Sequence, residues 1–203
     1  MRVLESGELN LLWSEIEWPL SSDSIQSDAV EFHRVISHIF ARVAVVPFRL
    51  LTVFDTEQAL AEFAATQRSA FLSDLRRLQD TVQMEFVIFF KPVRDADRSS
   101  GQAYLRQKAE VQRTIDQYSA AVRSSLAAIA RDTHTREVNT GSRIFCLVER
   151  GQESHFHSTI EGVAIPAGLE RRISGPWPPA EFLSDVVKAP PAAGKEAAIE
   201  RNG

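Results

Sequence analysis

Residues 81–90 read Thr-Val-Gln-Met-Glu-Phe-Val-Ile-Phe-Phe, and this stretch decides the fold. From Phe86 to Phe90, apolar side chains fall on both faces of the strand that the stretch predicts. A strand that is apolar on both faces is typical of a central position in a covered sheet. Pro92 ends the strand, because proline cannot donate to a strand ladder.

Upstream of this strand, the sequence predicts two amphipathic helices around a short strand. Apolar residues three and four apart predict a helix over 28–40, and a second helix over 55–80 begins with Asp55 as its expected cap. Between them, Val43–Phe48 is expected to form a strand. Pro47 places that strand at an edge or at its own end, since it removes one ladder donor.

Downstream, a long helix follows a polar segment. The segment 93–101 is charged and ends in Ser-Ser-Gly, so we expect a joint between two lobes there. Tyr104, Val111 and Tyr118 then recur seven residues apart and predict a helix over 102–131 with one apolar seam. Such a seam packs on its own domain or on a partner helix.

The C-terminal part completes an α+β pattern. Strands are predicted over 144–148 and 169–173, with a helix over 152–163 between them and a loop over 136–141 before them. The economical arrangement of these elements is two small α+β lobes joined by the long helix.

The expected domain limits follow from this pattern. The first lobe covers residues 1–97, and the long helix with the second lobe covers 98–188. Residues 189–203 are poor in apolar bulk and are expected to form a disordered tail.

Composition narrows the possible functions. The net charge is −4, from 23 basic and 27 acidic residues, so the chain lacks the basic field that nucleic-acid binding uses. No apolar run approaches the roughly 20 residues of a membrane span. The N-terminus has no secretory signal, and a cytoplasmic location is expected. The single cysteine, Cys146, lies in an apolar run and is expected to be buried.

Motifs for catalysis or cofactor binding are missing from the sequence. It has no glycine-rich phosphate loop and no nucleophile elbow. His155 and His157 form the closest histidine pair, but they lie in a predicted helix, where residues two apart point in different directions. We therefore expect no metal, no cofactor and no enzymatic activity.

Two segments remain as candidates for function. Pro47-Phe48-Arg49-Leu50-Leu51-Thr52-Val53-Phe54 places Arg49 between apolar neighbours, so this arginine is expected to be partly buried and to need an acceptor. Gly175-Pro176-Trp177-Pro178-Pro179 has three prolines and is expected not to continue a sheet. Trp177 then either plugs its own core or anchors a docking surface.

In this order, the two segments resemble motifs of the GvpL/GvpF family of gas vesicle proteins. The helix start Gly101-Gln102-Ala103-Tyr104-Leu105-Arg106-Gln107-Lys108 adds to the resemblance, which covers roughly residues 3–187. Leu50 and Leu51 stand where the family has Phe-Gly. The family's first strand, ahead of the segment that is similar to Val3–Trp13, has no counterpart.

The resemblance implies two α+β lobes, of which the first is ferredoxin-like without its first strand. It also implies an accessory or minor structural role in gas vesicle assembly, at the vesicle, with the small hydrophobic shell protein and other vesicle proteins as partners. The candidate contact residues are Pro47, Arg49, Tyr104, Gly175, Pro176, Trp177, Pro178 and Pro179. Two alternatives stay open: a ligand-binding regulatory module on a ferredoxin-like scaffold, and an enzyme with an unrecognised site near Arg49 and the histidines.

Overall fold

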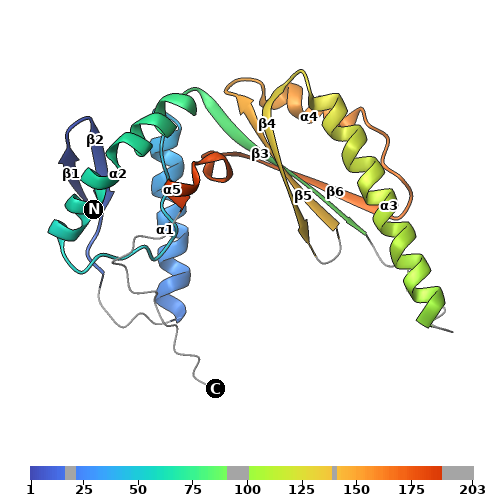
Figure 1. Ribbon diagram of the computed structural model, residues 1–203, viewed down its shortest axis with the longest axis horizontal. Helices are drawn as coiled ribbons and strands as arrows, with labels where there is room; N and C mark the ends of the chain where they lie inside the picture. The colour runs from blue at the N-terminus through green and yellow to red at the C-terminus, as the bar shows by residue number, and fades with distance from the viewer. Residues whose placement is uncertain (17–21, 91–100, 139–140, 189–203) are drawn as a thin grey trace. The chain divides into compact units, whose positions relative to one another are not determined.

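A computed structural model describes residues 1–16, 22–90, 101–138 and 141–188. The chain divides into two compact units (Figure 1). Unit 1 contains Met1–Gln79 and Leu183–Gly203, and unit 2 contains Asp80–Phe182. The predicted joint before Gly101 and the predicted tail lie outside the described residues.

Unit 1 begins with a hairpin of two antiparallel strands, β1 (Arg2–Ser6) and β2 (Leu9–Trp13). Leu9 and Leu11 are buried, whereas Val3 and Leu12 lie opposite each other on the other face and are exposed. Arg68 donates a hydrogen bond to Ser6 Oγ at 3.3 Å and joins the turn of the hairpin to the second helix of the unit.

The helices of unit 1 are α1 (Ser22–Phe40), α2 (Glu57–Arg77) and the short α5 (Asp185–Lys188). The helix expected over 28–40 therefore begins earlier, at Ser22. The N-cap of α2 is Thr56, whose Oγ1 accepts from Ala59 N at 3.1 Å. The expected cap, Asp55, lies one residue before this position and does not cap α2.

Between α1 and α2 the chain is irregular. The strand expected over Val43–Phe48 is wrong, because these residues pair with no described strand. Their side chains are exposed or half-buried. The apolar character of this segment instead serves side-chain packing, since Phe48 lies against Phe63 and Phe71 of α2 at centroid distances of 6.1 and 5.8 Å.

Unit 2 is built on a four-stranded antiparallel sheet with the strand order β4-β5-β3-β6. Its elements, in chain order, are β3 (Thr81–Phe90), α3 (Gly101–Leu126), β4 (Ala130–Val138), β5 (Gly141–Glu149), α4 (Glu153–Glu161), β6 (Leu169–Trp177) and the 3₁₀ turn η1 (Ala180–Phe182).

The succession β-α-β-β-α-β with this strand order is the ferredoxin-like topology. The α+β class is thus confirmed, whereas the sequence analysis expected the ferredoxin-like arrangement in the first lobe. The described sheet of unit 1 has only two strands, and the ferredoxin-like arrangement belongs to unit 2.

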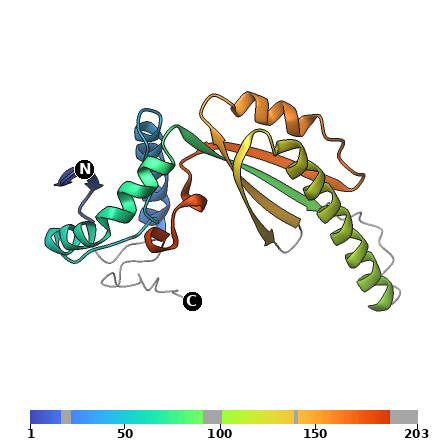
Figure 2. The same ribbon diagram turned by 45° about the horizontal axis from the view of Figure 1, so that its top comes forward.

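The centre of unit 2 is β3, as residues 81–90 predicted. Val82, Met84, Phe86 and Ile88 are completely buried on one face of the sheet. Helices α3 and α4 contact each other and cover this face (Figure 2). Phe86 meets Tyr118 of α3 at a centroid distance of 6.1 Å.

In the chain, the first part of unit 1 ends at Gln79 and unit 2 begins at Asp80, whereas the sequence analysis expected the first lobe to end at residue 97. Because β3 hydrogen-bonds to both β5 and β6, it belongs to the second unit together with α3. The long helix is therefore part of unit 2 rather than the connection between the lobes.

The loop expected over 136–141 is also wrong. Residues 136–138 belong to β4 and residue 141 begins β5. The strand β4 lies at the edge of the sheet and is mostly exposed, so it lacks the apolar alternation by which a half-buried strand is recognised.

Candidate interaction surface

The Pro47–Phe54 segment lies against α2 and is fixed at both of its ends. Phe48 contacts Phe63 and Phe71 of α2, and Phe54 contacts Phe63 at a centroid distance of 5.3 Å. Aromatic contacts of this geometry stabilise beyond the area they bury. Pro47 is half-buried directly before the first of these anchors.

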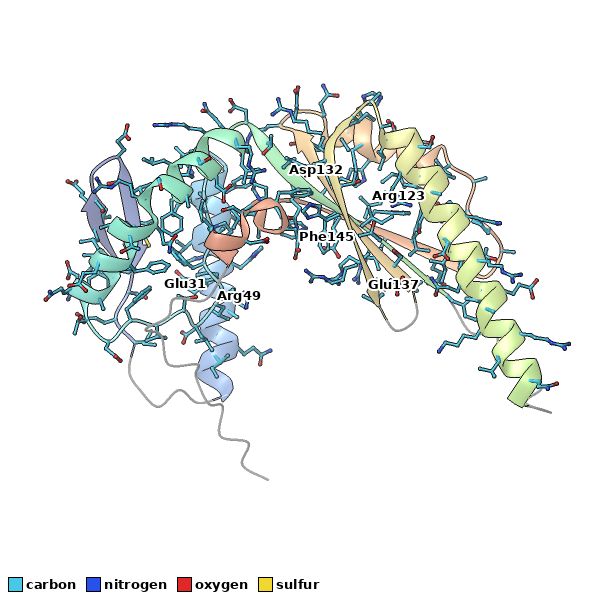
Figure 3. The ribbon with its side chains drawn as sticks, in the orientation of Figure 1. Glu31, Arg49, Arg123, Asp132, Glu137 and Phe145 are labelled. Atoms are coloured by element: carbon cyan, nitrogen blue, oxygen red, sulfur yellow. The ribbon has the colours of Figure 1, made fainter. Side chains whose placement is uncertain are left out.

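Between the anchors, the chain makes a tight turn that presents Arg49. Thr52 donates from its N–H at 3.1 Å and from its hydroxyl at 2.8 Å to the carbonyl of Arg49. Leu51 has a φ of 65° in this turn. The side chain of Arg49, labelled in Figure 3, is exposed and pairs with none of the described residues. The expectation that Arg49 is partly buried is therefore wrong.

The Gly175–Pro179 segment does continue the sheet, contrary to the sequence expectation. β6 runs to Trp177, which lies opposite Gln83 of β3, and a register shift between Gln83 and Glu85 accommodates one additional residue of β6. The Gly175–Pro176 peptide bond is cis. Prolines are accepted here because β6 is an edge strand with a bulge.

Only glycine fits at position 175. Its φ is 122°, and a Cβ atom there would lie 2.8 Å from the carbonyl oxygen of Gln83. Trp177 is half-buried, and its indole N–H donates to Ser174 Oγ at 3.5 Å. Pro178 is half-buried and Pro179 is buried.

After these prolines the chain folds back onto the sheet of unit 2. The N–H of Glu181 donates to Gln83 Oε1 at 2.9 Å, and Phe182 stacks on His134 of β4 at 4.7 Å. Arg136 of β4 pairs with Glu181 at 2.8 Å. The Gly175–Pro179 motif therefore turns the chain within unit 2. Trp177 is part of this turn, so it has a structural role within the unit.

The apolar seam of α3 is buried from its middle onward. Ile115, Tyr118, Val122 and Leu126 are buried in unit 2. Nearer the N-terminus, the helix extends beyond the sheet (Figures 1 and 2), and Leu105 is 64% exposed. Tyr104 lies in this part of α3, and its side chain is outside the described residues.

Of the exposed large apolar side chains in the described residues, most belong to unit 1. Val3 and Leu12 are 58% and 42% exposed, and they are direct cross-strand partners on one face of the hairpin. Val30 of α1 is 68% exposed. The predicted apolar stripe of α1 is only half-buried except for Phe40. The adjacent exposed pair of Val3 and Leu12 favours an interaction surface on this face of the hairpin. The sequence did not indicate that Val3 and Leu12 are exposed, because both faces of the hairpin carry apolar residues.

A polar hollow of about 230 Å³ lies in unit 2 between α3 and the strands β4 and β5. Its lining residues are Gln112, Asp116, Ser119, Arg123, Thr135, Glu137 and Ser142. Ser119 is 5% exposed, and its hydroxyl has no hydrogen-bond partner among the described residues. Sequence patterns did not point to this hollow, because its residues come from three separate elements.

Cys146, the single cysteine of the sequence, is buried in β5. Burial raises the pKa of the Cys146 thiol to about 12, so the thiol is not a nucleophile at neutral pH. Within residues 1–16, 22–90, 101–138 and 141–188, no group of three or more His, Cys, Asp or Glu side chains is placed to hold a metal ion. His155 and His157 lie on α4, as expected. Of the described helices, none combines the length and the apolar character of a membrane span.

Comparisons with known proteins agree with this architecture. The crystal structure of gas vesicle protein GvpF from Microcystis aeruginosa superposes with a TM-score of 0.69, at 14% identity, over 90% of this chain and 88% of that chain. GvpF from Anabaena sp. PCC7120 gives a TM-score of 0.58, at 14% identity, over 90% and 89%. No curated protein sequence matches significantly.

A family model described as gas vesicle synthesis protein GvpL/GvpF matches residues 1–184. This match covers both compact units, and the superposed crystal structures share the fold. The chain therefore belongs to the GvpL/GvpF family of gas vesicle synthesis proteins.

Proposed function

We propose that this protein is an accessory factor of gas vesicle assembly that binds the small apolar shell protein through the exposed face of the β1–β2 hairpin. It acts in the cytoplasm, at the vesicle, and other vesicle proteins are further partners. The observation that carries the proposal is the exposed cross-strand pair of Val3 and Leu12, in a chain of a gas vesicle synthesis family.

The hairpin offers two kinds of contact to an apolar partner. Covering the Val3–Leu12 pair removes apolar surface from water, and a fully covered side chain of this size contributes about 1.5–3 kcal/mol. Among the described strands, β1 and β2 pair only with each other, so each has one edge that pairs with no described strand. A strand of the partner can add to such an edge through main-chain hydrogen bonds.

Arg49 is the second contact that we propose in unit 1. Its guanidinium is exposed on a turn that Phe48 and Phe54 hold against α2. The backbone of this turn is already fixed and loses little freedom on binding, and arginine is enriched among the residues that dominate interfaces. Pro47 supports this turn. We also propose Tyr104 and the Gly175–Pro179 motif as partner contacts, and this proposal rests on the sequence motifs alone.

Co-expression of the tagged protein with the shell protein, followed by affinity capture, tests the proposal. We expect Val3→Thr/Leu12→Thr to reduce capture of the shell protein about tenfold or more, because it removes apolar surface and keeps strand propensity. Leu105→Gln is the control, since it removes a leucine of unit 2 that is more exposed than Leu12. Equal capture by the hairpin variant and the wild type would contradict the proposal.

The polar hollow favours a second candidate function, the binding of a small polar ligand on the ferredoxin-like unit. Asp116, Arg123 and Glu137 carry charges of both signs around the buried hydroxyl of Ser119. A ligand that binds the folded state raises the melting temperature by mass action. A thermal-shift screen of small amino acids and amines tests it. No rise with any compound, or an equal rise in Ser119→Ala, would exclude this candidate.

A further inference from the structure

The edge strand β4 of unit 2 carries a pattern of charges that is complementary to itself. β4 is the end strand of the order β4-β5-β3-β6, and its outer edge pairs with none of the described strands. Its side chains from His134 to Val138 are all exposed. Figure 3 labels Asp132 and Glu137 near the two ends of the strand.

The residues of β4 read Ala-Arg-Asp-Thr-His-Thr-Arg-Glu-Val. When two copies run antiparallel with His134 opposite His134, Thr133 lies opposite Thr135 and Asp132 lies opposite Arg136. Within the regular stretch from Asp132 to Arg136, both charged residues therefore face an opposite charge in the second copy, and the two threonines face each other.

We propose that β4 pairs antiparallel with β4 of a second copy of this chain, about a two-fold axis at His134, to form one continuous eight-stranded sheet from two copies of the four-stranded sheet. An isologous interface of this kind uses the same surface twice, so the edge must be complementary to itself. Strand addition at a sheet edge supplies main-chain hydrogen bonds, and opposite-charge and Thr–Thr pairs across the strands supply the specificity.

The backbone and the side chains of β4 permit this arrangement. The strand is regular from Asp132 to Val138, and its one register shift lies between Ala130 and Asp132. Arg136 already contacts Glu181 at 2.8 Å, but a guanidinium has further N–H donors for Asp132 of the second copy. The carboxylate of Asp132 accepts from the N–H of Thr133 at 2.7 Å, which leaves acceptor positions for an arginine.

The charges also select one register. Because successive side chains alternate between the faces of a strand, a symmetric pair can slip only in steps of two residues. One such slip places His134 opposite Arg136, and the opposite slip places Ala130 opposite Arg136. Both remove the two Asp132–Arg136 pairs of the symmetric dimer, so the register at His134 is the one that the charges favour.

Charge-reversal variants with sedimentation velocity test the proposal on the full chain. Arg136 also pairs with Glu181, so all proteins carry Glu181→Gln, which breaks that ion pair without altering the edge. The Glu181→Gln parent is expected to form a concentration-dependent dimer. Asp132→Arg and Arg136→Asp each place like charges opposite one another and are expected to raise the dimer dissociation constant on the order of 30-fold.

An equimolar mixture of the two variants decides the question. In the mixed pair, the arginine introduced at position 132 of one chain meets the aspartate introduced at position 136 of the other, so the dimer is expected to re-form only in the mixture. Arg172→Asp, on the opposite edge strand β6, is the control and is expected to leave the dimer unchanged. A monomeric parent, single variants that still dimerise, or a mixture that stays monomeric would each overturn the proposal. The recovered heterodimer also proves that both variants fold.

Discussion

Leu51 occupies a backbone conformation that favours glycine. Its φ of 65° lies in the left-handed region, which costs a residue with a Cβ atom about 1–2 kcal/mol. The turn is closed by the two hydrogen bonds from Thr52 to the carbonyl of Arg49, and it lies between the aromatic anchors Phe48 and Phe54. The anchors and the turn together hold Leu51 in this conformation.

Glycine substitutions at Leu50 and Leu51 measure this strain. Both leucines are half-buried, and each substitution removes the same side chain and adds the same freedom to the unfolded chain. Because only Leu51→Gly relieves the positive φ, we expect it to destabilise unit 1 by about 1–2 kcal/mol less than Leu50→Gly. Urea unfolding of both variants gives the comparison, and equal free energies of unfolding would mean that Leu51 is unstrained.

At the scale of single residues, the sequence predicted some properties and not others. Gly175 and the prolines after it were recognisable as backbone constraints. The structure gives the reason for the glycine, since a Cβ atom at position 175 would collide with the carbonyl of Gln83. The exposure of Arg49 was not predictable from its apolar neighbours. Their side chains point to α2, while the turn between them directs the arginine to solvent.

At the scale of elements, Arg171 of β6 joins three parts of unit 2. Its Nη1 donates to the carbonyls of Ile160 and Val163 at 2.7 and 2.8 Å, at the C-terminal end of α4. It also donates to the hydroxyl of Tyr118 on α3 at 2.8 Å. The last carbonyls of a helix lack intrahelical donors, and a guanidinium satisfies them well.

Methionine substitutions at two neighbouring arginines test this role. Arg171→Met is expected to lower the free energy of unfolding of unit 2 by about 2–4 kcal/mol, because it removes three charged hydrogen bonds, to Tyr118 and to the carbonyls of Ile160 and Val163. Arg172→Met is the control, since Arg172 is exposed, and it is expected to change stability by less than about 0.5 kcal/mol. Thermal or urea unfolding distinguishes them, and equal effects would show that the contacts of Arg171 do not stabilise the unit.

Elements with a strong apolar pattern were predictable, and elements without one were not. The bounds of β3 are those of the predicted strand, because its two apolar faces are both covered. The edge strand β4 was missed because its charged residues show no buried face. The Val43–Phe48 prediction failed for the opposite reason, since apolar residues there pack through side chains without joining a sheet.

At the scale of the whole molecule, the chain leaves unit 1 after Gln79 and returns to it at Leu183. Asp74 of α2 binds the returning segment at Ser184. Its carboxylate accepts from the N–H and the hydroxyl of Ser184 at 2.8 and 2.9 Å, and from Arg77 at 2.8 Å. The side chain is 3% exposed. Burial acts to raise the pKa of Asp74, but the hydrogen bonds from Arg77 and Ser184 outweigh it and lower the pKa below its ordinary value.

Asp74 therefore makes the stability of unit 1 depend on pH. A lowered folded-state pKa adds stability above the unfolded pKa of about 3.9, and this contribution is lost as the pH falls below that value. We expect Asp74→Asn to destabilise by about 2–3 kcal/mol at pH 7, because a buried acceptor of charged hydrogen bonds is lost. The difference from the wild type should shrink at pH 3, as measured by urea unfolding at both values.

Asp28→Asn is the control, since Asp28 is an exposed carboxylate of α1 in the same unit. It is expected to leave the free energy of unfolding within about 0.5 kcal/mol of the wild type. If Asp74→Asn behaved like this control at pH 7, the contacts with Ser184 and Arg77 would not contribute to stability.

The division into units could not be predicted from the sequence. Polar residues at 93–101 suggested a boundary, but the strand before them pairs with strands that follow much later in the chain. A discontinuous unit depends on long-range contacts such as that of Asp74 with Ser184. Local composition carries no information about such contacts.

The return of the chain to unit 1 also sets the order of events during translation. The nascent chain leaves unit 1 at Gln79, and the ribosome then synthesises all of Asp80–Phe182 before Ser184 emerges. Until Ser184 emerges, the carboxylate of Asp74 lacks the two hydrogen bonds that this serine donates. The ferredoxin-like unit is therefore complete first, and the N-terminal unit is the last to close, although its residues were made earliest.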